Sequence, residues 1–151
     1  MVDPTIEAAR KVLDESVEEI RRGIAGLTID QLNATPAGGD TNPIAVIATH
    51  ALASTLSWLS LAMGAPLPDR DRPAEFRAVA DDGFVDRTED AIRRCLTVLD
   101  ASEWDAARVG IPNWTAGGPD EPRTAAYALS HALAHLGEHV GHLHMTRELL
   151  R

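Results

Sequence analysis

The sequence predicts an all-α fold, a four-helix bundle with long irregular connections between helices two and three and between helices three and four. Alanine and leucine dominate the composition and β-branched runs are almost absent, a bias that favours helices. Four segments of about twenty residues place apolar side chains at helical spacing, and none shows the alternation of a strand. The length of 151 residues fits one domain, so we expect residues 1–151 to form a single bundle.

The first two helices are predicted over residues 4–26 and 43–63. Pro4 suits the first turn of a helix, and apolar residues recur behind it on one face, opposite glutamates and arginines. The second helix is expected to begin at Pro43, after a cap by Thr41 or Asn42. It is apolar on nearly every side, so we expect it to be buried or to pack against another subunit, and a homodimer is predicted.

The last two helices are predicted over residues 84–101 and from residue 121 to the C-terminus. The connection over 65–83 and the irregular stretch over 102–121 are long, and connections of this length are uncommon unless they are functional or loosely ordered. Both are expected to carry short helical turns at most.

Charge and composition exclude several function classes. The formal net charge is −9 and there is no basic patch, so we expect no nucleic-acid partner and no anionic membrane surface. No apolar stretch of membrane-spanning length is free of polar residues, and the first residues do not resemble a secretory signal. A cytoplasmic protein with no membrane partner is therefore expected. Cys95 is the only cysteine, which excludes an intrachain disulfide.

Histidines concentrate near the C-terminus, where five of the six lie within fourteen residues. On a helix, His131, His135, His139 and His142 fall within a quarter-turn arc, and His144 points elsewhere. Two histidines at this spacing can hold one metal ion from one side. The spacing alone allows three pairs, 131 with 135, 135 with 139, or 139 with 142.

A third protein ligand must come from another segment, and His50 is the only other histidine in the chain. Neutral imidazole suits Zn²⁺, Ni²⁺ or Fe²⁺, and three protein ligands leave a coordination position open, as in catalytic zinc sites. In the alternative interpretation, the histidines pair through hydrogen bonds inside a structural dimer, because each buried imidazole nitrogen needs a partner.

The chain resembles the DinB-like superfamily of metal-binding four-helix bundles, which includes mycothiol- and bacillithiol-dependent transferases. The resemblance covers essentially the whole chain. It rests on His50 following the Asn42-Pro43 helix start, on His-x-x-x-His in the last helix, on the ending Gly141-His142-Leu-His144-Met-Thr-Arg147-Glu148, and on the run over 69–76.

The resemblance implies a specific metal site. Counting back from Arg147-Glu148 places the family's ligand pair on His135 and His139, with His50 as the third ligand. His131 and His142 are then candidates to line the pocket or to support a ligand, and the alternative is that either is a plain helix residue. The implied cofactors are a divalent metal ion, zinc first and nickel or iron as alternatives, and a low-molecular-weight thiol such as mycothiol as cosubstrate.

The function implied by the resemblance is a thiol-dependent S-transferase or isomerase that acts on small electrophilic substrates. The thiolate is the nucleophile in such chemistry. The partners would be a small-molecule thiol and an electrophile. The alternative is a non-catalytic, stress-related DinB-like protein that binds a metal or a small molecule.

Other candidates for the binding site lie outside the last helix, and no residue is assigned a catalytic role. Arg70 and Arg72 are cofactor-binding candidates because arginine recognises carboxylates bidentately, but ion pairs with the acidic residues of the same segment are the alternative. Trp58 shares a stripe with the second-helix histidine and is a candidate pocket wall, as is Trp114 in a loop; core packing or a dimer contact is the alternative for Trp58.

Overall fold

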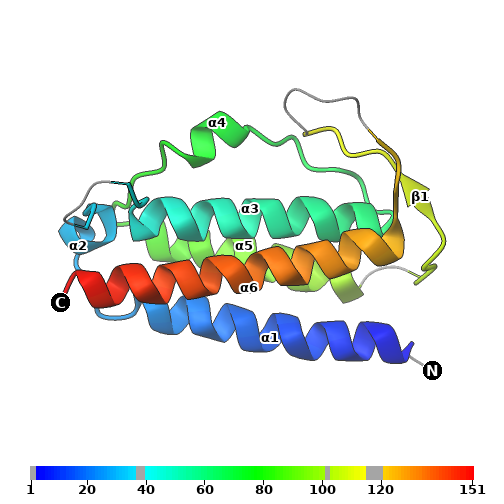
Figure 1. Cartoon of the computed structure of the whole chain (residues 1–151), viewed down its shortest axis with the longest axis horizontal. Coiled ribbons are helices and arrows are strands. Elements are labelled where there is room, and N and C mark those ends of the chain that lie inside the picture. The colour runs from blue at the N-terminus through cyan, green and yellow to red at the C-terminus, as the bar shows by residue number, and fades with distance from the viewer. Residues whose placement is uncertain (1–2, 37–39, 101–102, 115–120) are drawn as a thin grey trace.

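Four long helices run side by side in the computed structural model, which describes residues 3–36, 40–100, 103–114 and 121–151 (Figure 1). This architecture confirms the predicted all-α bundle. The long helices are α1 (Pro4–Ile24), α3 (Ile44–Met63), α5 (Phe84–Asp100) and α6 (Ala125–Leu149); the short elements are α2 (Ile29–Asn33), α4 (Arg72–Glu75), β1 (Val109–Gly110) and β2 (Arg123–Thr124).

The helix α1 begins and ends where local chemistry dictates. The Asp3 side chain accepts a hydrogen bond from the backbone N–H of Thr5, and Pro4 occupies the first turn. Its buried stripe faces α5 and α6. The helix ends at Ile24 rather than at the predicted residue 26, because Gly26 adopts a φ of 72° that a helix does not contain.

The apolar helix α3 packs against α5 and α6 and is overlaid by α4 (Figure 1). By length and composition it could cross a membrane, yet 89 % of its apolar stretch is buried inside the bundle. Its surface is thus covered within one chain, so its apolar character no longer argues for a second subunit. The homodimer stays a prediction.

The connections differ from the expected pattern in three places. Pro43 itself occupies the cap position of α3, and neither Thr41 nor Asn42 caps the helix with its side chain. In the stretch over 102–121, the described residues 103–114 carry a turn at 106–107 followed by the short strand β1. The last helix begins at residue 125 rather than 121, because Arg123–Thr124 pairs with β1 in an antiparallel register.

The connection between α3 and α5 contains the predicted helical turn, α4, which lies over α3 (Figure 1). Asp71 caps this turn by accepting a hydrogen bond from the backbone N–H of Ala74. The turn carries Glu75 to the bundle, where its side chain is buried. A loop that contributes a buried carboxylate to a helix bundle is positioned to shape a site there. The predicted helix end at residue 101 and parts of the irregular stretch over 102–121 lie outside the described residues.

Candidate metal centre and its cavities

Three imidazoles from two helices converge between α3 and α6. His50 lies near the middle of α3, and His135 and His139 lie one turn apart on α6, which runs beside α3 along its length (Figure 1). One ligand nitrogen from each of the three lies within 4.8 Å of the others. The Nε2 atoms of His135 and His139 are 3.2 Å apart. The spacing along the helix allowed three histidine pairs, and the pair that faces His50 is His135 with His139.

The geometry of the three imidazoles fits a divalent metal ion. Ligand nitrogens bound tetrahedrally at about 2 Å from one zinc ion are about 3.3 Å from one another. A hydrogen bond between His135 and His139 would account for one pair of nitrogens but not for the convergence of His50 upon both. The Nδ1 atoms of His135 and His139 are buried and have no hydrogen-bond partner among the described residues. No hydrogen bond at Nδ1 therefore fixes how either ring is turned.

A buried carboxylate orients His50. The Nδ1 atom of His50 lies 2.7 Å from Oε2 of Glu75, and both side chains are buried. Because a carboxylate accepts hydrogen bonds, Nδ1 carries the proton and the lone pair lies on Nε2, the atom that can bind a metal. Arg70 holds the same carboxylate with two hydrogen bonds, Nε to Oε1 at 2.6 Å and a second to Oε2 at 2.9 Å.

The electrostatics of this group favour a bound cation. Burial alone would raise the pKa of Glu75, but the hydrogen bonds from Arg70 and His50 outweigh it and lower the pKa, so the carboxylate is ionised. Burial, then the neighbouring imidazoles, lower the pKa of His139 to about 4, and the same causes lower the pKa of His135. Both rings are therefore neutral at neutral pH, as a metal ligand must be.

A polar cavity of about 320 Å³ opens beside the imidazoles. We call it the arginine cavity. All three residues predicted to bind a cofactor line it, Trp58, Arg70 and Arg72, and so does Trp114. Arg70 is committed to its ion pair with Glu75, which matches the alternative that the sequence left open for it. The exposed Arg72 lies over the Phe76 ring at 5.1 Å.

The remaining histidines of α6 have separate surroundings. His131 lies between the ring of Trp58, at 4.4 Å between centroids, and that of His135, at 5.6 Å, and it lines the arginine cavity. Its pKa is lowered by burial. His142 lies 5.7 Å from the His139 ring. The roles of His131 and His142 in binding stay predictions, and His144 lies beside Glu19 of α1.

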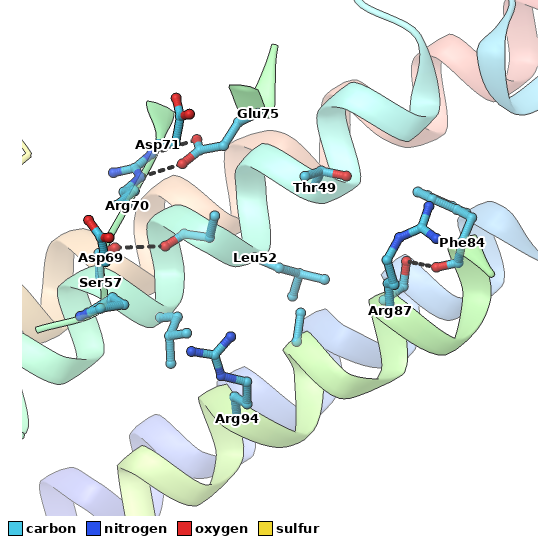
Figure 2. Close-up of a pocket in the computed structure, with 15 residues that line it drawn as sticks. Thr49, Leu52, Ser57, Asp69, Arg70, Asp71, Glu75, Phe84, Arg87 and Arg94 are labelled. Carbon is cyan, nitrogen blue, oxygen red and sulfur yellow. Dashed lines mark hydrogen bonds and ion pairs between the residues drawn. The ribbon is translucent and has the colours of Figure 1, made fainter. Parts of the chain in front are cut away.

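A different cavity, of about 280 Å³, lies between α3, α5 and the segment before α4 (Figure 2). Arg70 and Glu75 stand on one side of it, and Arg87 and Arg94 of α5 stand on the other. None of the histidines lines it. The Arg70–Glu75 pair therefore separates this cavity from the imidazole cluster.

The single cysteine takes no part in this site. Cys95 is fully buried on α5, and burial raises the pKa of its thiol to about 12. Its sulfur lies 3.7 Å from the carbonyl oxygen of Leu52. A protonated, buried thiol is not a nucleophile, so thiol chemistry at this site requires a thiol from outside the chain.

Sequence reasoning did not identify Glu75 as the partner of His50, nor Phe76 as its neighbour at 4.7 Å between ring centroids. The segment over 69–76 offered three carboxylates within seven residues, and all were equivalent as sequence letters. Only the cap at Asp71 and the turn that follows it decide which carboxylate faces the bundle.

Comparison with known proteins agrees with this architecture. The family model described as Mycothiol-S-transferase matches residues 8–151. A solved structure, that of a conserved protein from Enterococcus faecalis, is similar with a TM-score of 0.67 and 20% sequence identity, covering 99% of this chain and 98% of that one. At this identity the likeness shows the fold alone. A search of curated proteins finds no match. The chain belongs to the mycothiol S-transferase family, within the DinB-like bundles.

Proposed function

We propose that this protein transfers a low-molecular-weight thiol of the mycothiol type to a small electrophile, at a divalent metal ion held by His50, His135 and His139. The observation that carries the proposal is the convergence of these imidazoles from two helices to within 4.8 Å. Family membership supports the thiol as cosubstrate. The proposal further specifies mycothiol as the thiol and the cytoplasm as the location of the protein.

The chain's own residues prepare the site for this chemistry. A bound divalent cation supplies Lewis acidity, which lowers the pKa of a thiol and yields the nucleophilic thiolate at neutral pH. Glu75 fixes the ring of His50 with its Nε2 lone pair free, and Arg70 keeps that carboxylate ionised and in place. His135 and His139 are held neutral by burial, so protons do not compete for their lone pairs at neutral pH.

Zinc is the metal we propose, because three protein ligands with an open position are the arrangement of catalytic zinc sites. Nickel and iron share the preference for imidazole and are the alternatives. The arginine cavity is the proposed binding site for the thiol, since Trp58 and Trp114 offer aromatic faces and Arg72 an exposed guanidinium to a hydrophilic molecule.

Metal content tests the ligand set. We expect tag-free protein to hold about one zinc ion per chain and the His135→Ala variant to hold less than half of that amount. His144→Ala is the matched control, because this ring lies beside Glu19 rather than among the other imidazoles. Elemental analysis measures the zinc content per chain of all three proteins. Retention of zinc by His135→Ala would count against the site.

Turnover tests the reaction separately. We expect the metal-loaded protein to conjugate mycothiol to a panel of electrophiles faster than the metal-free protein does. A protein that holds zinc as predicted, but shows no rate above the metal-free background with any of several thiols, would instead be the non-catalytic metal binder.

A further inference from the structure

A second cavity, of about 310 Å³, adjoins the imidazole cluster at its other end. We call it the apolar cavity. His50 lines both it and the arginine cavity, while His135 lines only the arginine cavity and His139 only the apolar one. Along α6 the arginine cavity uses residues before the ligand pair, and the apolar cavity uses residues after it. The imidazole cluster therefore lies between two separate chambers.

The linings of the two chambers differ in charge and polarity. The apolar cavity is walled by Val46 and Ile47 of α3, Phe76, and Met145 and Leu149 of α6. Among the described residues no arginine or lysine lines it. Its polar lining residues are Asp40, the one carboxylate, with Thr41, Asn42, His50, His139, His142 and Thr146. The arginine cavity, by contrast, is lined by the guanidinium groups of Arg70, which is paired with Glu75, and of the exposed Arg72, and no carboxylate of the described residues lines it. A negatively charged ligand is thus favoured in one chamber and disfavoured in the other.

We infer that the apolar cavity holds the second substrate, an uncharged apolar electrophile, so that thiol and electrophile meet at the imidazole cluster from opposite ends. The inference rests on the proposed function and adds the chemical class of the electrophile and the residues that bind it. It favours transfer to uncharged compounds over isomerisation of unsaturated acids, because away from the metal ligands the described residues of this chamber offer a carboxylate no arginine or lysine.

The size of the chamber limits the electrophile. A volume of about 310 Å³ lies near the lower end for small-molecule sites. At about 30 Å³ for each water-sized group, it accommodates about ten non-hydrogen atoms. A monocyclic aromatic compound with one reactive substituent fits this volume.

The reaction with an organic halide balances without a further reactant. The thiol gives its proton to solvent, and the thiolate sulfur forms a bond to the carbon that carries the halogen. The carbon–halogen bond breaks, and the halide leaves with the electron pair. The products are a thioether, a halide ion and one proton. Val46 and Ile47 are both buried and offer apolar contacts to the carbon framework of the electrophile.

A matched pair of substrates tests the charge preference. 4-Methylbenzyl chloride and 4-(chloromethyl)benzoate react at the same kind of carbon and differ at the far end of the ring in charge. With mycothiol and zinc-loaded protein, and with each rate divided by its uncatalysed rate, we expect kcat/KM for the methyl compound to be at least tenfold higher. Equal rates, or a preference for the benzoate, would overturn the inference.

Met145→Arg tests the location of the electrophile. Met145 lines the apolar cavity and its side chain is 66 % exposed, so an arginine is tolerated there and adds a cation. We expect the preference for the methyl compound to fall at least fivefold, with the KM for mycothiol unchanged. Val85→Arg is the matched control, because this residue is 51 % exposed on α5 and lines none of these cavities. An unchanged preference in Met145→Arg would place the electrophile elsewhere.

Unreactive analogues separate the inference from the proposed function. 4-Methylbenzyl alcohol should shift the backbone amide resonances of Val46, Ile47 and Thr146 in zinc-loaded protein, and 4-(hydroxymethyl)benzoate should not. Binding of the alcohol without any turnover would refute the transferase and leave the chamber's ligand class standing. Metal-dependent turnover that favours the benzoate would refute the ligand class and leave the transferase standing.

Discussion

His50 is a buried imidazole whose orientation depends on residues from another part of the chain. Glu75 accepts from its Nδ1, and Arg70 satisfies both carboxylate oxygens. Buried polar groups require such partners, and here the chain of contacts ends with a free lone pair that faces two other imidazoles. The sequence could supply the residue types of this chain of contacts, but not which carboxylate among several would complete it.

Glu75→Gln is expected to weaken zinc binding at least tenfold while leaving the fold intact. The amide keeps the shape of the carboxylate but loses the charge that strengthens the hydrogen bond to His50, and such supporting groups contribute tenfold to a hundredfold in affinity. Competition with a chelator measures the dissociation constant. Asp69→Asn is the control, because Asp69 lines only the cavity on the other side of the Arg70–Glu75 pair. A change below twofold for Glu75→Gln would refute the positioning role.

The stability of the metal-free protein is expected to fall on acidification between about pH 6.5 and pH 4. Burial lowers the pKa of His139 to about 4, whereas the unfolded chain has a histidine pKa of about 6.5. Between these values the unfolded state binds the proton and the folded state does not, so acid favours unfolding; above about pH 6.5 both forms are neutral and the full stability is present.

Urea unfolding of chelator-treated protein across this pH range measures the effect, and His139→Ala should lose stability less steeply over the same interval. A wild-type unfolding free energy that is constant from pH 7 to pH 4 would show that the ring is not buried in its neutral form.

At the scale of the elements, the long helices were predictable and the short ones were not. Apolar periodicity over about twenty residues fixes a helix, and α1, α3 and α5 begin and end within two residues of the predictions. The pairing of β1 with β2 has no such periodic pattern, because two residues in a strand are too few to alternate. That pairing moves the start of α6 to residue 125, and the site is unaffected because its histidines lie deeper in the helix.

Two glycine substitutions test how closely the helices pack. Gly23 of α1 approaches Leu143 of α6, where an added Cβ would overlap the Cδ2 atom; at Gly137 an added Cβ meets nothing within 4 Å. Alanine gains about 1 kcal/mol of helix propensity at either position, but overpacking costs about 1–3 kcal/mol. The free energy of unfolding, measured with urea, should therefore be about 1–3 kcal/mol higher for the Gly137→Ala variant than for the Gly23→Ala variant. Equal values would mean that Leu143 moves aside freely.

At the scale of the whole molecule, the bundle joins parts of the chain that are far apart in sequence. α3 and α6 are adjacent in space, which brings His50 beside His135 across 84 intervening positions. The sequence predicted the bundle, and the family resemblance selected the three histidines. The two chambers at either end of the imidazole cluster could not be predicted, because each is formed by side chains from several elements.

X-ray absorption spectroscopy of zinc-loaded, tag-free protein tests the central claim most directly, because it reads the atoms bound to the metal. We expect three imidazole nitrogens at about 2.0–2.1 Å, with the remaining coordination from solvent oxygen, and one imidazole fewer in the His50→Ala variant. A wild-type spectrum with fewer than three imidazoles, or one that His50→Ala leaves unchanged, would contradict the account.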